Sequence, residues 1–260
     1  MQERHLNRNI YFDEQVITTK QYVIPYISKV KQIKEGDYVL EVGCGEGGNL
    51  MPFYELGCYC FGVDLDNFRI EIAKSKLPHD HVTLLNQNIY DIDEHNFPQF
   101  DLIFLRDVIE HIHHQDQFIS FIRKFLKPDG VIFFAFPPWR MPFGGHQQIA
   151  HHKYLSKLPF YHILPEKWYH YMLKKSKESE DTIQNLMEIK ETRISIHRFQ
   201  KIIKQNHFEI KKSTYWLINP NYEIKFHLKP HKLYFLKYIP FIKDFFTTCY
   251  YAVVVPDKEG

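Results

Sequence analysis

Five short apolar runs, most of them followed by a helix-like segment, constrain the fold of this chain more than any other feature. Each run is apolar at consecutive positions, which is typical of a strand buried on both faces. The alternation of such strands with helices predicts an α/β protein with a doubly wound, Rossmann-like, mostly parallel sheet. The five runs are Tyr38–Val42, Cys58–Val63, Val82–Asn86, Phe100–Leu105 and Val131–Phe136.

The pattern changes along the chain and divides it into four expected parts. Residues 1–37 are expected to form an N-terminal helical segment, and 38–136 an α/β core. Residues 137–193 have no strand pattern and are expected to form a mostly helical cap or insertion. Residues 194–260 return to the pattern of the sheet, with a helix, two strands and a long aromatic connection. Helices are expected at 49–56, 68–77, 116–126 and 194–206, and the last two strands at 207–218 and 249–256.

Composition and charge exclude few functions. The chain has 33 Lys and Arg against 31 Asp and Glu, and a net charge of +2 is too small to indicate a nucleic-acid partner. Four cysteines without a CxxC pair suggest neither a disulfide framework nor a zinc knuckle, and they are typical of a reducing compartment. The first residues lack a secretory signal, and no apolar stretch is long enough to span a membrane, so a cytoplasmic protein is expected.

A glycine-rich turn after the first run is the main functional signal. Gly43, Gly45 and Gly47 follow the strand directly, and glycines allow a ligand to lie close to the backbone. Asp64 ends the second run, 21 residues after Gly43, where a carboxylate can accept hydrogen bonds from both ribose hydroxyls. Together these residues predict a site for an adenosine-containing ligand.

Two cofactors compete for such a site, because Gly43, Gly45 and Gly48 also satisfy the GxGxxG pattern of dinucleotide enzymes. Glu41 favours S-adenosylmethionine, since its carboxylate suits an ammonium group and would repel a pyrophosphate. The polar turn after the fourth run and the lack of a second dinucleotide-type half favour the same ligand.

The glycine turn, Asp64 and the segment FDLIFLRDVIEHI (Phe100–Ile112) together resemble the class I S-adenosylmethionine-dependent methyltransferases, particularly their broad small-molecule group. The resemblance covers about 38–136 well and 194–256 loosely. It implies a seven-stranded sheet whose last strand is antiparallel. It also implies S-adenosyl-L-methionine as cofactor and S-adenosyl-L-homocysteine as product.

The resemblance also assigns cofactor contacts. The acidic residue before the turn and the turn itself would hold the methionine moiety, Asp64 the ribose, and the residues after the second and third runs the adenine. Asn88 stands where the family often has Asp, and Arg106 where many relatives have a small residue. Arg106 would reach the acceptor or the cofactor carboxylate, or cover the sheet edge. The implied contacts are Glu41, Gly43, Cys44, Gly45, Gly47, Asp64, Leu65, Asn88, Ile89 and Arg106.

His146 is the candidate general base. It follows two glycines in the loop that leaves the fifth run, at the edge where open α/β sheets bind ligands. A loop histidine making an ordinary hydrogen bond is the alternative. No metal site is predicted, because His146, His151 and His152 have no carboxylate or cysteine at the usual spacing. Glu110 and His111 are interpreted as scaffold of their loop.

These observations predict an enzyme that methylates a small-molecule or glycan-type acceptor, with oxygen favoured as the target atom. An S-adenosylmethionine-binding regulatory or interaction protein without turnover is one alternative. A protein or RNA methyltransferase is another; the small net charge and the lack of an Asp/Asn-Pro-Pro-aromatic tetrad after the fourth run argue against it. The aromatic and basic residues of 219–247 are compatible with peripheral membrane contact, but a lid packed on its own domain is favoured. The sequence does not predict an oligomeric state.

Overall fold

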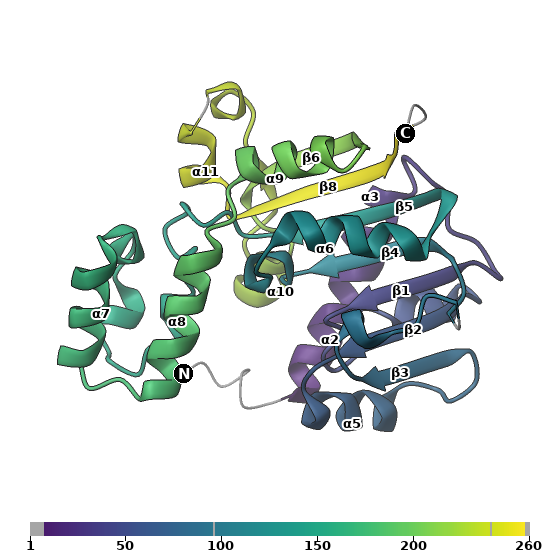
Figure 1. Ribbon diagram of the computed structural model, residues 1–260, viewed down its shortest axis with the longest axis horizontal. Helices are drawn as coiled ribbons and strands as arrows, with labels where there is room; N and C mark the ends of the chain where they lie inside the picture. Colours follow the sequence, from purple (N-terminus) through teal and green to yellow (C-terminus); the bar gives the residue numbers. More distant parts are fainter. Residues whose placement is uncertain (1–7, 96, 240, 258–260) are drawn as a thin grey trace.

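The computed structural model describes residues 8–95, 97–239 and 241–257 and contains an eight-stranded sheet flanked by helices (Figure 1). The strand order is β3-β2-β1-β4-β5-β8-β6-β7. The strands are β1 (Tyr38–Val42), β2 (Tyr59–Asp64), β3 (Val82–Asn86), β4 (Phe100–Arg106), β5 (Leu126–Phe136), β6 (Phe208–Ile218), β7 (His231–Lys232) and β8 (Cys249–Pro256).

The helices lie on both faces of the sheet and in the segment after β5 (Figure 1). Several begin at a side-chain cap; Asp66, for example, accepts hydrogen bonds from two backbone N–H groups at the start of α5. The α-helices are α2 (Arg8–Thr18), α3 (Ile24–Ile27), α4 (Met51–Glu55), α5 (Asn67–Lys76), α6 (Gln115–Ile122), α7 (Glu166–Lys175), α8 (Glu180–Thr192), α9 (Ile196–Gln205), α10 (Asn221–Phe226) and α11 (Ile242–Phe246). A π-helical segment, η1 (Thr19–Val23), joins α2 to α3.

The topology confirms the predicted α/β class and the antiparallel last strand. β1 to β5 pair in parallel, whereas β8 runs antiparallel to both β5 and β6. The predicted number of seven strands is wrong, because β7 adds an eighth that pairs with β6. β7 is only two residues long, too short for an alternating or continuous apolar pattern to reveal it.

The central strands are apolar on both faces because each face of the sheet carries its own core. In β4, Ile103 and Leu105 belong to the core under α6 and α9, while Leu102 and Phe104 belong to the core under α3, α4 and α5. All four side chains are at most 1% exposed. This arrangement explains why the strand reads as a continuous apolar run.

The segment after β5 has a small core of its own, formed by α7, α8 and the short helical turns before them. Tyr169, Leu173 and Leu186 are fully buried there. The end of α8 returns to the sheet: Thr192 donates a hydrogen bond of 2.5 Å to the carbonyl oxygen of Glu110. The helices of this segment therefore support the loop that follows β4.

The connection from β6 to β8 is partly packed and partly exposed. Asp244 accepts a hydrogen bond from the backbone N–H of Ile196, and Phe245 contacts Phe160. In contrast, Phe235 is 87% exposed and Tyr238 is 76% exposed. Among the described helices, none has both the length and the apolar character needed to span a bilayer.

Candidate cofactor and acceptor site

The glycine turn leaves β1 at the carboxyl edge of the sheet with three residues in the left-handed region. Gly43, Gly45 and Gly47 have φ angles of 71°, 52° and 77°, which side chains rarely tolerate. The N–H groups of Gly43 and Cys44 donate to the carbonyl oxygen of Val63, at 2.7 and 3.1 Å. The turn is longer than predicted, because α4 begins only at Met51 instead of residue 49.

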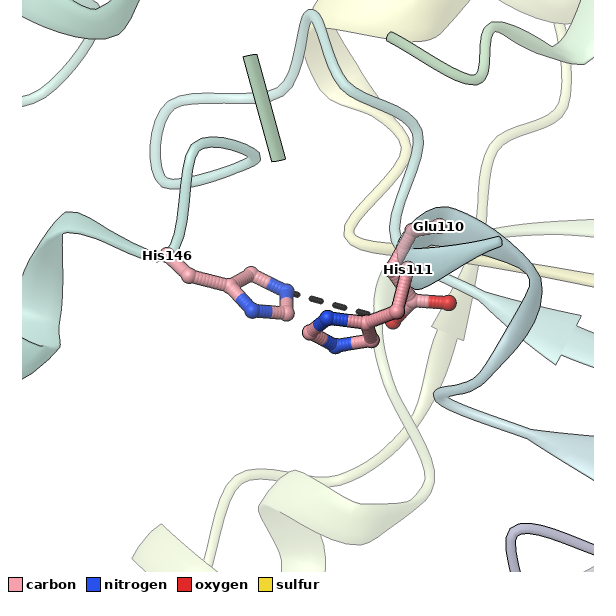
Figure 2. Close-up of side chains that lie close together, drawn as sticks. All are labelled: Glu110, His111 and His146. Atoms are coloured by element: carbon pink, nitrogen blue, oxygen red, sulfur yellow. Dashed lines mark ion pairs between the residues drawn. The ribbon is translucent and has the colours of Figure 1, made fainter. Parts of the chain in front are cut away.

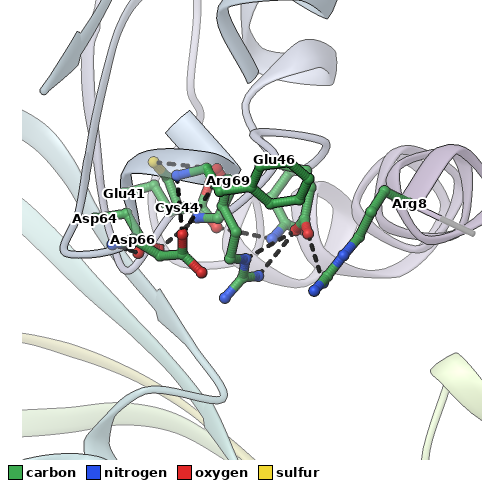
Figure 3. A network of polar contacts seen from close by, with 10 residues as sticks. Arg8, Glu41, Cys44, Glu46, Asp64, Asp66 and Arg69 are labelled. Carbon is green, nitrogen blue, oxygen red and sulfur yellow. Dashed lines mark hydrogen bonds and ion pairs between the residues drawn. The ribbon is translucent and has the colours of Figure 1, made fainter. Parts of the chain in front are cut away.

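A network of charged side chains crosses the turn (Figure 3). The side chain of Glu46 is fully buried; its Oε2 accepts a hydrogen bond of 2.9 Å from Arg69 Nη2, and its Oε1 one of 2.8 Å from Arg8 Nη1. A Cβ at Gly45 would lie 2.1 Å from Arg69 Nη2, so this glycine makes room for the guanidinium group. Sequence reasoning missed these residues, since their partners are brought together only by the fold.

Asp64 joins the end of β2 to the turn. Its Oδ2 accepts from the N–H of Gly45 at 2.7 Å, and its Oδ1 accepts from the N–H of Asp66 at 2.9 Å. Each carboxylate oxygen has a second lone pair, so both can still accept a hydroxyl hydrogen. Leu65 is 72% exposed beside this carboxylate. The arrangement fits a ribose diol on Asp64 with an adenine against Leu65.

Glu41 brings an unpaired carboxylate oxygen to the same edge. Its side chain is buried, and Oε1 accepts a hydrogen bond of 2.7 Å from Asn49 Nδ2. Among the described residues, Oε2 is buried without a hydrogen-bond partner. Asn49 Oδ1 in turn accepts from Arg106 Nη1 at 3.0 Å and from Thr19 Oγ1 at 2.8 Å. A buried, unpaired carboxylate oxygen suits the ammonium group of a methionine moiety.

The Glu41→Gln variant tests this assignment. Burial raises the pKa of the Glu41 carboxyl well above 4.5, so the folded protein retains the proton over a range where the unfolded chain has lost it. The stability that this carboxyl group contributes is therefore complete below its ordinary pKa of 4.5. That stability is lost as the pH rises through the pKa of the group in the folded protein. As the pH rises, the melting temperature of the cofactor-free protein is expected to fall less steeply in the variant than in the wild type.

The same variant is expected to bind S-adenosylhomocysteine about tenfold more weakly in calorimetry, because the amide lacks the charge that attracts the ammonium group. If Glu41→Gln bound S-adenosylhomocysteine as tightly as the wild type does, Glu41 would not be the residue that holds the ammonium group.

Three predicted cofactor contacts have other local roles in the structure. The Cys44 side chain is fully buried in the core, and both of its backbone polar groups bond within or beside the turn. Asn88 accepts a hydrogen bond of 3.1 Å from the N–H of Tyr90 and caps the short helix Ile89–Asp91. Ile89 is only 5% exposed. Any contact of Cys44 with the cofactor would therefore come from its backbone.

The loop after β4 and the loop after β5 meet beside the glycine turn. His146 Nε2 lies 3.9 Å from Glu110 Oε1, and the ring centroids of His146 and His111 are 5.0 Å apart (Figure 2). A Cβ at Gly43 would lie 2.5 Å from Val108, so the segment that carries Glu110 and His111 borders the turn. The structure thus brings the candidate base close to two residues that the sequence pattern assigns to the scaffold of their loop.

Buried polar contacts hold the loop of His146 in place. His162 is fully buried, with its ring nitrogens 3.1 Å from Gln147 Nε2 and 2.7 Å from the carbonyl oxygen of Trp139. Burial and the neighbouring His162 lower the pKa of His146 to about 4, so its ring is neutral at neutral pH. His151 is not part of this group, because its ring lies 3.2 Å from Glu178.

A family model described as a methyltransferase domain matches residues 12–186, which is more than half of the chain. A ubiquinone biosynthesis O-methyltransferase of Bartonella bacilliformis is 34% identical over 102 residues, 37% of this chain and 40% of that protein. The chain therefore spans about two fifths of the length of this relative.

Solved structures share the fold over most of the chain. PKMT2 from Rickettsia typhi in complex with AdoHcy has a TM-score of 0.55 and 18% identity, covering 94% of this chain and 54% of that one. The plantazolicin methyltransferase BpumL, in complex with a triazolic desmethylPZN analog and SAH, has a TM-score of 0.57 and 11% identity, covering 98% and 89%. At these identities the likeness concerns the fold.

Proposed function

Because the chain belongs to the class I S-adenosylmethionine-dependent methyltransferases, we propose that it transfers the methyl group to an oxygen of a small-molecule or glycan-type acceptor. The observation that carries this proposal is the group formed by Glu110, His111 and His146 beside the glycine turn. An acceptor bound between this group and the turn would lie near the methyl group. The similarity to an O-methyltransferase supports oxygen as the target.

The residues of the site would divide the work as follows. Asp64 would hold the ribose, Leu65 would flank the adenine, and Glu41 would hold the ammonium group. Gly43, Gly45 and Gly47 would let the cofactor approach the backbone. Arg106 would act mainly through Asn49, which it holds in place against Glu41.

His146 would take the proton of the acceptor hydroxyl, since its neutral ring offers a lone pair. Bound S-adenosylmethionine supplies a methyl carbon already activated by the sulfonium. The acceptor oxygen would form the new bond to that carbon, and the electron pair of the broken carbon–sulfur bond would stay on sulfur. The protein contributes chiefly alignment of the two reactants and exclusion of water between them.

Transfer of labelled methyl groups into a fractionated cell extract tests the proposal, with wild type and Asp64→Ala compared. We expect label in the small-molecule fraction with the wild type and a large loss with the variant. Mass spectrometry of the labelled product is expected to locate the methyl group on oxygen. Label in the protein or RNA fraction would favour a macromolecular acceptor. S-adenosylhomocysteine binding without label in any fraction would favour a regulatory protein.

A further inference from the structure

Glu110, His111 and His146 form a compact group of metal-ligating side chains. One ligand atom from each residue lies within 4.8 Å of the ligand atoms of the other two. Figure 2 shows His146 extending from its loop toward the other two residues, which sit on the short helix η3 (Ile109–His111) after β4. Two imidazoles and one carboxylate are a donor set that proteins use for zinc and related divalent ions.

The buried carboxylate of Glu110 independently supports a bound cation. Its side chain is 3% exposed, and among the described residues neither carboxylate oxygen has a hydrogen-bond partner. Buried carboxylates are ordinarily paired or bound to a metal, because an unpaired one is costly. Its backbone is held by Thr192, so the side chain is kept at this position although no described group satisfies it.

We propose that Glu110, His111 and His146 bind one divalent transition-metal ion of the zinc type. Ligand atoms around one such ion lie roughly 3 to 4 Å apart, so the group must close slightly on binding. His111 can make this adjustment, because its side chain is exposed whereas Glu110 is buried. Three protein ligands leave at least one coordination position open, as in catalytic zinc sites. The spacing of His146, His151 and His152 predicts no metal site, because the sequence alone does not bring Glu110 and His111 near His146.

The ion would change the role of His146, and this step rests on the proposed function. The lone pair of His146 would bind the ion instead of taking the acceptor proton. The ion would lower the pKa of an acceptor hydroxyl that approaches its open position, and water would receive the proton. The oxygen would then form its bond to the methyl carbon, while the carbon–sulfur electron pair stays on sulfur.

Titration of the chelator-stripped full chain with Co²⁺ tests the proposal, because the visible absorption of Co²⁺ reports ligand number and type. We expect the wild type to bind one ion, and Zn²⁺ to displace it. Glu110→Gln and His146→Ala are each expected to weaken Co²⁺ binding at least about tenfold. His151→Ala is the matched control and is expected to bind Co²⁺ like the wild type, since its histidine has its own carboxylate, Glu178.

Calorimetry with S-adenosylhomocysteine shows whether each variant is folded and separates the two proposals. Wild-type protein that binds S-adenosylhomocysteine but no Co²⁺ would overturn the metal site and leave the methyltransferase proposal intact. Co²⁺ binding by Glu110→Gln equal to that of the wild type would also overturn it. Wild-type protein that binds Co²⁺ at this site but transfers no methyl group would keep the metal site and overturn the proposed function.

Discussion

The His146→Ala variant is expected to lose turnover by about 10²- to 10⁴-fold, the range over which a positioned proton acceptor accelerates a reaction. Its affinity for S-adenosylhomocysteine is expected to stay within about twofold of the wild type, because Glu41 lies in β1 and Asp64 at the end of β2, outside the loop that carries His146. Initial rates of S-adenosylhomocysteine formation with an active extract fraction, together with calorimetry, measure the two quantities.

His151→Ala is the matched control for this prediction, because it removes an imidazole from the same loop. The His151 side chain is 61% exposed and pairs with Glu178, so its loss is expected to change turnover by less than about twofold. Unchanged turnover in His146→Ala would exclude His146 from the chemistry. An equal loss of cofactor affinity would instead indicate that the variant disturbs the glycine turn.

His111→Ala distinguishes the two roles proposed for His146. If His146 acts alone as a base, His111→Ala retains most of the turnover. If the two histidines and Glu110 share an ion, His111→Ala loses turnover to a similar extent, and a chelator inhibits the wild type. The outcomes differ because removal of any one of its protein ligands impairs a metal site, whereas a single base needs only its own lone pair.

Most of the sheet could be predicted from the sequence because a strand buried on both faces has apolar residues at consecutive positions. In β4 every side chain from Phe100 to Leu105 is buried, so the strand is visible without knowledge of its neighbours. The same logic placed β8 correctly at Cys249–Pro256. β7 has only His231 and Lys232, both exposed, and its pairing with β6 depends on the path of the chain. Such a strand leaves no local pattern.

The candidate site, like the sheet, could be predicted from the sequence only in part. The glycine turn and Asp64 are spaced for a strand-turn-helix unit, so their neighbourhood follows from the local sequence. Glu110 and His146 are 36 positions apart, and only the packing of two loops brings them together. Glu178, in the link between α7 and α8, likewise accepts hydrogen bonds from the backbone N–H groups of His151 and His152. Histidine spacing alone could not indicate which of these rings meets a carboxylate.

The Asp64→Ala variant is expected to bind S-adenosylhomocysteine about 100-fold more weakly or worse. Hydrogen bonds to a charged group contribute about 1.5 to 3 kcal/mol each, and the variant loses one to each ribose hydroxyl. The carboxylate also accepts from the N–H groups of Gly45 and Asp66, so the variant is expected to unfold at a lower temperature. Calorimetry and thermal melting measure the two effects separately.

Asp66→Ala controls for the loss of stability, because this neighbouring carboxylate caps α5 through Phe68 and Arg69. The cap loss is expected to cost about 1 kcal/mol while affinity changes by less than about twofold. Asp64→Asn keeps an oxygen acceptor for Gly45 but removes the charge, and is expected to fall between Asp64→Ala and the wild type. If Asp64→Ala binds S-adenosylhomocysteine as tightly as Asp66→Ala does, the ribose is not held at the end of β2. Heat from a nicotinamide coenzyme in the wild type, with none from S-adenosylhomocysteine, would contradict the choice of cofactor made from Glu41.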